Sequence, residues 1–193
     1  TIDMKKEDYV ILVDMDDTME ELLKCWVAYL NSKYDLTVDF SNIVNWELPP
    51  YFPSLTPEQV YEALVEDALW KTVTPIEGSV EYLRKLIEEG FTVRVCTASS
   101  PTSYALKMRY VMKRYFPFIN TRTQCICIHD KQMVKADILL DDNPNNLIGG
   151  SYKGVLFNRR TNENADYPIR VNSWDEFYEY VQKDFSEKNK KIF

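Results

Sequence analysis

The chain alternates between short apolar runs and longer stretches whose apolar residues recur at helical spacing. The short runs, several of them rich in β-branched residues, predict strands over residues 9–13, 91–96, 125–128, 136–140 and 154–157. The longer stretches predict helices over residues 20–34, 56–70, 79–89, 100–115 and 173–185. Strands that alternate with helices indicate a three-layer, Rossmann-like α/β fold with a mostly parallel sheet and right-handed crossovers.

Capping residues support several of these boundaries. Thr56 with Gln59, and Ser173 with Glu176, have the spacing of capping boxes that open helices. Residues 187–191 are mostly charged and predict a frayed end.

The stretch from residue 19 to residue 72 differs from the rest, because it contains no strand pattern. It combines two predicted helices with a loop rich in Pro and aromatic residues, and we call it the helical insertion. The sequence therefore predicts an α/β core made of residues 1–18 and 73–193, interrupted after the first strand by the helical insertion, residues 19–72.

Composition restricts the partners of the protein. The 193 residues are 45% hydrophobic and carry a formal net charge of −7. This charge gives no general attraction to a nucleic acid polymer or to an anionic membrane. The apolar runs are too short to span a bilayer, and acidic residues near the start do not fit a signal peptide. We therefore expect a soluble, cytoplasmic protein.

Rare residues exclude several classes of enzyme. All five glycines lie at or beyond Gly78, so no dinucleotide-binding loop or Walker loop follows the first strand. The single histidine, His129, excludes an H-E-x-x-H zinc site, and the chain has no G-x-S-x-G motif. The four cysteines contain no C-x-x-C pair, and we expect them to be structural.

Polar residues follow three of the predicted strands. They are Asp14 and Asp16 after the first, Thr97 after the second, and Asp141 and Asp142 after the fourth. Ligands of open α/β sheets bind at the carboxyl ends of the strands, so we expect the four carboxylates to converge. Two carboxylates ~4 Å apart repel by about 4 kcal/mol at an effective dielectric of 20, which Lys131 alone does not offset. A divalent cation does, and the all-oxygen set predicts Mg²⁺.

The order of these residues resembles the four signature motifs of the haloacid dehalogenase-like (HAD) hydrolases, which are mostly phosphatases. The motifs are Asp14-Met-Asp16-Asp-Thr18, Thr97, Lys131 and Asp141-Asp142. More narrowly, residues 75–78, 96–97, 130–131 and 136–142 resemble the 5'(3')-deoxyribonucleotidase family. Two positions depart from that family, with Asp17 where better-known members have Gly and Ala98 where they have Ser. The resemblance implies the HAD fold, with the helical insertion as a small cap.

The resemblance also implies an Mg²⁺-dependent phosphatase that dephosphorylates 5'(3')-deoxyribonucleoside monophosphates through an aspartyl-phosphate intermediate. Asp14 would be the nucleophile, and Asp16 would be the general acid and base. The implied phosphate-binding residues are Thr97, Ala98, Ser99 and Lys131. The implied metal ligands are Asp14, the carbonyl oxygen of Asp16, Asp142 and, as a ligand or an orienting residue, Asp141.

The helical insertion would supply the rest of the substrate site. Leu22, Trp46 and Trp70 could form a dry wall beside the sugar. Aromatic side chains of the insertion, Trp46, Tyr51, Phe52 and Trp70, favour a nucleobase, because aromatic rings stack on bases. The same residues are equally typical of the core of a small helical segment.

Two other hypotheses stay open on the sequence alone. The same motifs serve HAD phosphatases for other small phosphoesters, such as sugar phosphates or phosphoglycolate. A receiver-like signalling domain also places an acidic pair, a Thr and a Lys around Mg²⁺, but it needs a lone phospho-accepting Asp where this chain has the helical insertion. We expect a small-molecule nucleotide as the partner, with no membrane and no nucleic acid polymer. The sequence leaves open a homodimer, the preferred base and movement of the cap.

Overall fold

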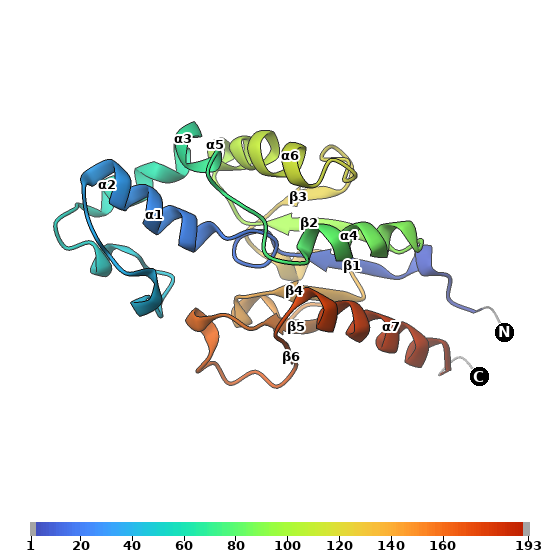
Figure 1. Ribbon diagram of the computed structural model, residues 1–193. Helices are drawn as coiled ribbons and strands as arrows, with labels where there is room; N and C mark the ends of the chain where they lie inside the picture. The colour runs from blue at the N-terminus through green and yellow to red at the C-terminus, as the bar shows by residue number, and fades with distance from the viewer. Residues whose placement is uncertain (1–2, 191–193) are drawn as a thin grey trace.

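The sheet has six strands, all paired in parallel, in the order β3-β2-β1-β4-β5-β6 (Figure 1). The computed structural model describes residues 3–190. The strands are β1 (Val10–Val13), β2 (Thr92–Thr97), β3 (Cys125–Cys127), β4 (Ile138–Asp141), β5 (Lys153–Phe157) and β6 (Arg170–Val171). The five predicted strands are confirmed. The sixth, β6, has two residues, too few to leave an alternating pattern in the sequence.

The helices follow the predicted order with one break. They are α1 (Leu22–Tyr34), α2 (Pro57–Glu62), α3 (Asp67–Trp70), α4 (Ser79–Glu88), α5 (Pro101–Leu106), α6 (Lys113–Tyr115) and α7 (Trp174–Lys190). A π-helical segment, Lys107–Met112, joins α5 to α6.

The predicted helix 56–70 is wrong in its middle. It begins at the predicted capping box of Thr56 and Gln59, but it breaks at Glu66, whose backbone is extended (φ −104°, ψ 126°). The Glu66 carboxylate accepts hydrogen bonds from the Tyr29 hydroxyl and from Lys33 Nζ, both on α1. These contacts with a separate helix fix Glu66 outside helical geometry.

The prediction of a frayed end is also wrong. Helix α7 continues to Lys190, and residue 191 lies outside the described residues. Lys188 pairs with Asp137 at 3.2 Å, and the Asn189 side chain accepts a hydrogen bond from the Met4 amide at 3.0 Å. Both partners come from other parts of the core, so tertiary contacts stabilise the last turns of α7.

The two faces of the sheet are covered differently. Ile11 and Val13 of β1 belong to the large core that also holds residues of α4, α5 and α7. Leu12 faces the other side and packs in a smaller cluster with Leu147 and Tyr152, which lie between β4 and β5. Of the residues packed around that cluster, Ile126 belongs to β3 and the others come from loops; none comes from an α-helix, so the layer on this side is thin.

The helical insertion projects beyond the end of β1 (Figure 1). Its two connections to the core run side by side, because Glu20 forms a single antiparallel bridge with Pro75. Next to this bridge, the Glu21 amide donates to the Thr74 carbonyl at 2.9 Å. Residues 19–72 contain helices and loops but no strand.

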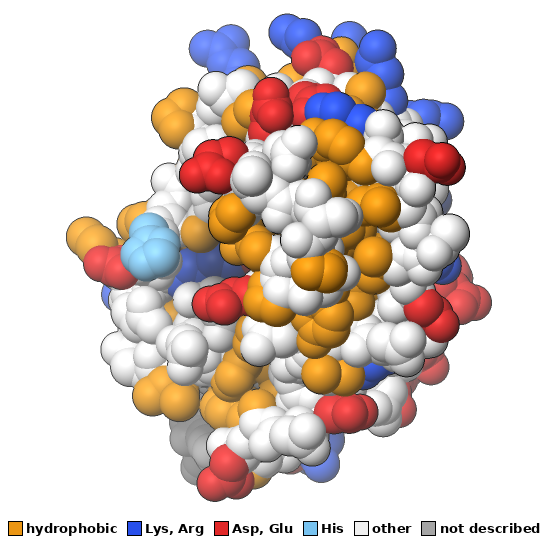
Figure 2. Space-filling view, turned by 90° about the vertical axis from the view of Figure 1, so that its left-hand side faces the viewer, with side chains coloured by type: hydrophobic (Ala, Val, Ile, Leu, Met, Phe, Trp, Pro, Cys, Tyr) orange, Lys and Arg blue, Asp and Glu red, His pale blue; other side chains and the backbone are white. Residues whose placement is uncertain are grey.

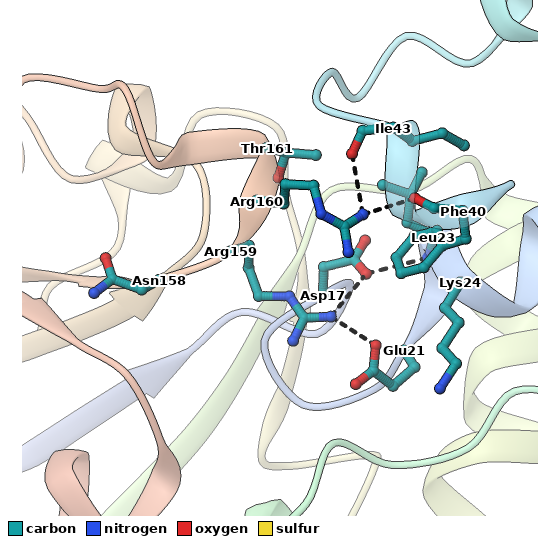
Figure 3. A pocket seen from close by; sticks show the side chains of 10 residues that line it. All are labelled: Asp17, Glu21, Leu23, Lys24, Phe40, Ile43, Asn158, Arg159, Arg160 and Thr161. Atoms are coloured by element: carbon teal, nitrogen blue, oxygen red, sulfur yellow. Dashed lines mark hydrogen bonds and ion pairs between the residues drawn. The ribbon is translucent and has the colours of Figure 1, made fainter.

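Two arginines that follow β5 contact the helical insertion (Figure 3). Arg160 donates to the carbonyl oxygens of Phe40 at 2.6 Å and Ile43 at 3.3 Å, and its guanidinium carbon lies 4.9 Å from the centre of the Phe40 ring. Arg159 pairs with Glu21 at 2.6 Å. These groups line a cavity of about 430 Å³ between the insertion and the core. Among residues 3–190, no helix has the length and apolar character needed to cross a membrane.

Candidate active site

Three neighbouring strands bring polar side chains to one edge of the sheet. Asp14 follows β1 directly, Thr97 ends β2 and Asp141 ends β4. Since β2 and β4 both pair with β1, these residues meet at the carboxyl ends of the strands. A cavity of about 360 Å³ opens there, lined by acidic residues of the core and by side chains of the helical insertion.

Lys131 lies between two of the carboxylates. Its Nζ donates to Asp14 Oδ1 at 2.6 Å and to Asp141 Oδ2 at 2.8 Å, and its side chain is 1% exposed. Burial alone would lower the pKa of the ammonium group, but the two carboxylates outweigh burial and raise it above its ordinary value. Lys131 therefore stays cationic and holds Asp14 in a fixed position.

Three carboxylates form a cluster suited to a metal ion. Asp14, Asp141 and Asp142 each place one oxygen within 4.8 Å of the others, and all three are buried. Burial and the neighbouring carboxylates raise the pKa of Asp141 to about 6, and they raise that of Asp142 well above its ordinary value. Each negative charge thus lacks full compensation. A divalent cation bound by these oxygens would supply the missing positive charge, and Mg²⁺ fits this donor set.

Asp16 lines the same cavity as the other three aspartates, but its carboxylate is not part of this cluster. Its Oδ2 pairs with Lys107 Nζ at 2.5 Å, and among the described residues its buried Oδ1 has no hydrogen-bond partner. Glu20 beside it is fully buried, and burial together with the charge of Asp16 raises the pKa of Glu20. Asp14 and Asp16 therefore pair with different lysines. Lys131 binds Asp14, and Lys107 binds Asp16.

Asp17 occupies a turn that normally favours glycine. Its φ of +60° lies in the left-handed region. Asp17 Oδ1 accepts a hydrogen bond from the Leu23 amide at 3.1 Å, at the start of α1, and lies 3.8 Å from Arg159 Nη2. Burial raises the pKa of Asp17 to about 7, although Arg159 opposes the shift. The departure from the family pattern is therefore compensated by a helix-capping contact.

The end of β2 and the loop after it present two hydroxyl groups. Ala98 has none, but Ser99 supplies one a residue later, and its Oγ lies 3.4 Å from Thr97 Oγ1. Lys107 Nζ donates to Thr97 Oγ1 at 3.0 Å and to Ser99 Oγ at 2.6 Å. Both hydroxyls thus share Lys107 with Asp16, and Ser99 lines a smaller neighbouring cavity together with Asp16 and Lys107.

The aromatic residues of the helical insertion divide into two groups. Trp46 lines the cavity, and its Nε1 donates to Asp142 Oδ2 at 3.1 Å. Phe52 and Trp70 are 0% and 1% exposed and belong to the core, and Trp70 lines a smaller neighbouring cavity beside Lys107. Tyr51 accepts a hydrogen bond from the Val44 amide.

The remaining cavity wall on the insertion side is largely apolar. It is formed by Leu22, Leu23, Trp26, Tyr61 and Leu64. Figure 2 shows hydrophobic side chains gathered in a band over the end of the molecule that carries the helical insertion. An apolar wall thus faces an acidic floor.

Lys107 and Asn146 are site residues that the sequence analysis missed. Asn146 Nδ2 donates to Asp141 Oδ2 at 3.1 Å. Lys107 looks like an ordinary solvent-exposed helix residue, although Ser103, Lys107 and Val111 share one helix face and all three are buried. Its place on the helix face shared by Ser103 and Val111 is the signal that could have identified Lys107 as a site residue.

The fold of the chain is the HAD fold. A solved structure of a HAD family hydrolase from Deinococcus radiodurans R1, with bound phosphate and sodium, has a TM-score of 0.64 at 16% identity and covers 93% of this chain and 97% of that chain. A HAD-like protein from Streptococcus pneumoniae has a TM-score of 0.60 at 12% identity, covering 90% of this chain and 98% of that chain. Identities this low show similarity of fold.

The chain belongs to the family described as 5' nucleotidase, deoxy (Pyrimidine), cytosolic type C, whose profile matches residues 8–185. The 5'(3')-deoxyribonucleotidase of Bacillus subtilis (strain 168) is 34% identical over 174 residues, 90% of this chain and 96% of the relative. A 5'(3')-deoxyribonucleotidase of Clostridium acetobutylicum is 28% identical over 167 residues, 85% of this chain and 89% of the relative. The protein is therefore a phosphoric monoester hydrolase of the 5'-nucleotidase type, and the receiver-like alternative is wrong.

Proposed function

We propose that this chain is an Mg²⁺-dependent phosphatase of 2'-deoxyribonucleoside monophosphates that uses Asp14 as its nucleophile. The position of Asp14 carries the proposal. Its carboxylate is held by Lys131 and lies in the oxygen cluster with Asp141 and Asp142, in a cavity walled by apolar side chains. A fixed carboxylate beside a cation site is the arrangement that phosphoryl transfer to Asp needs.

The reaction would proceed in two steps. An oxygen of Asp14 attacks phosphorus to give an aspartyl-phosphate, and the bond from phosphorus to the nucleoside oxygen breaks while Asp16 gives that oxygen a proton. A water molecule then attacks the same phosphorus and passes a proton to Asp16, which restores Asp14 and releases phosphate. Lys131 and the hydroxyls of Thr97 and Ser99 would hold the phosphoryl oxygens.

The carboxylate cluster would hold the metal ion. Its ligands would be Asp14, Asp142 and the carbonyl of Asp16, with Asp141 as a ligand or an orienting residue. Bound there, Mg²⁺ would neutralise charge between the nucleophile and the phosphate. We expect EDTA to abolish phosphate release and Mg²⁺ to restore it. Full activity after exhaustive chelation would show that the cluster is not a metal site.

The apolar wall supports a deoxyribose rather than a ribose. Leu22 and Leu64 offer no hydrogen-bond partner from their side chains, and Trp46 Nε1 already donates to Asp142. Burying an unpaired 2'-hydroxyl costs ~1 to 3 kcal/mol, which corresponds to roughly 5- to 150-fold in catalytic efficiency. The relatives in Bacillus subtilis and Clostridium acetobutylicum are named as deoxyribonucleotidases, which agrees with this argument.

The test measures phosphate release from a panel at one Mg²⁺ concentration. The panel contains dUMP, dTMP, UMP, a 2'-deoxynucleoside 3'-monophosphate, glucose 6-phosphate and phosphoglycolate. We expect kcat/KM for dUMP to exceed that for UMP by the factor given above, and uracil or thymine to be the preferred base. A dUMP to UMP ratio near one would favour a broad nucleotidase, and preference for glucose 6-phosphate or phosphoglycolate would favour the alternative of another small phosphoester.

A further inference from the structure

Lys107 is a second buried lysine at the site, with a side chain 2% exposed. Its Nζ lies 2.5 Å from Asp16 Oδ2, 3.0 Å from Thr97 Oγ1 and 2.6 Å from Ser99 Oγ. An ammonium group has three donors, and these three partners account for all of them. The side chain thus ties the loop after β1 to the loop after β2.

The Lys107 side chain is surrounded by apolar groups except at its charged end. The centre of the Trp70 ring lies 5.5 Å from Nζ, and the neighbouring Leu106 and Val111 are buried. Every polar partner of Nζ instead belongs to the site, so the charge serves the site rather than the core.

The backbone at Lys107 is also unusual. Lys107 is the first residue of the π-helical segment Lys107–Met112, which interrupts an otherwise α-helical run from α5 to α6. Segments of π-helix are rare and frequently occur at functional sites.

Each of the two buried lysines binds one of the two carboxylates that follow β1. Lys131 binds Asp14, the proposed nucleophile, and Lys107 binds Asp16, the proposed proton donor. Lys107 also fixes the side chains of Thr97 and Ser99 next to Asp16. The other oxygen of Asp16 is buried beside the Glu20 carboxyl and meets no other hydrogen-bond donor among the described residues, so the hydrogen bond from Lys107 fixes the Asp16 carboxylate from the opposite oxygen.

We propose that Lys107 is a positioning residue that holds Asp16 in the orientation from which it protonates the leaving oxygen. This inference rests on the proposed function. As the bond from phosphorus to the nucleoside oxygen breaks, the proton moves from the Asp16 carboxyl to that oxygen, and Lys107 keeps the carboxyl in place. Lys107 itself transfers no proton and forms no covalent bond.

The test compares Lys107→Met with Lys113→Met, which changes an exposed lysine farther along the same helical run. Two substrates distinguish a role in protonating the leaving oxygen from a role in the attack by Asp14. The nucleoside oxygen of dUMP needs a proton to leave, whereas the nitrophenolate of 4-nitrophenyl phosphate leaves without one. For Lys107→Met we expect kcat with dUMP to fall roughly 100-fold, the loss typical of a misplaced catalytic group. The first burst of nitrophenolate, which reports only attack by Asp14, should stay within about fivefold of wild type.

Two further variants keep the test decisive. In an Asp16→Asn background, adding Lys107→Met should change kcat with dUMP by less than about twofold, because the group that it positions is already lost. Lys107→Arg keeps the charge and should recover part of the activity.

Several results would overturn the inference. A parallel loss of the burst and of dUMP turnover would indicate a general structural or phosphate-binding role, and so would a rise in KM with kcat unchanged. Lys107→Met activity equal to that of Lys113→Met would exclude any role. If the wild-type protein with Mg²⁺ hydrolyses neither substrate, the proposed function fails instead.

Discussion

Replacing Lys131 with Met removes the cation between the carboxylates of Asp14 and Asp141. Lys131 Nζ lies 2.6 and 2.8 Å from their oxygens, and one such contact amounts to about 6 kcal/mol of attraction at an effective dielectric of 20. Desolvation of the ammonium group opposes this attraction. Breaking a buried ion pair by removing one partner costs ~3 to 5 kcal/mol, because a buried charge is left without compensation. We expect that loss in the free energy of unfolding.

The control is Lys135→Met, an exposed lysine four residues further along the chain. Surface substitutions of this kind change stability by about 0.5 kcal/mol or less. Urea unfolding of both variants in EDTA, followed by circular dichroism at pH 7, gives the two free energies. Phosphate release from dUMP with Mg²⁺, measured where each variant is folded, gives the effect on activity.

Two outcomes would refute the argument. A loss of less than about 1 kcal/mol for Lys131→Met would mean that the carboxylates do not depend on this cation, contrary to the geometry. Activity toward dUMP within tenfold of that of Lys135→Met, a difference in barrier of only ~1.4 kcal/mol, would show that Lys131 does not orient the nucleophile.

Three more changes test other parts of the structure. Asp14→Asn should abolish turnover of dUMP, since an amide is a very poor nucleophile; activity within tenfold of wild type would exclude the covalent mechanism. Burial raises the pKa of Asp184, but the Tyr9 hydroxyl and Lys153 outweigh it and lower the pKa overall. A lowered pKa contributes stability that is present above about pH 4 and is lost as the pH falls through the folded-state pKa. Asp184→Asn should therefore cost ~1.5 to 3 kcal/mol in urea unfolding at pH 7, with the gap to wild type closing below about pH 4, and an equal gap at both pH values would contradict this. Arg160→Met removes the charged donor to the Phe40 carbonyl, so amide hydrogen exchange over residues 40–43 should rise by at least about tenfold; unchanged exchange would mean that Arg160 does not hold the helical insertion.

The strands and the order of the site residues were predictable because their causes are local. A parallel strand buried on both faces has to be apolar throughout, as residues 10–13 are, and its end has to turn polar where it meets the cavity. The misjudged segments depend on residues far away in the chain. Glu66 breaks its helix through contacts with Tyr29 and Lys33, and the end of α7 is held by Asp137 and the Met4 amide.

In the candidate site, too, some positions follow from local sequence and others depend on residues far away in the chain. Trp46 and Trp70 have identical side chains, yet Trp46 lines the cavity while Trp70 packs in the core. Only the folding of the helical insertion decides between these positions. Lys107 was missed for a related reason, because the partners that make it important, Asp16 and Thr97, lie 91 and 10 residues away.

The narrow connection between the helical insertion and the core has a consequence for evolution. The chain leaves and re-enters the core at adjacent points, bridged at Glu20 and Pro75, and the four motifs shared with HAD hydrolases lie outside residues 19–72. A segment whose two ends lie side by side can be lengthened, shortened or exchanged while the strands keep their register. Selection on the substrate can therefore act on residues 19–72 almost independently of selection on the chemical step, and descendants of one catalytic core can diverge in what they bind while retaining how they react.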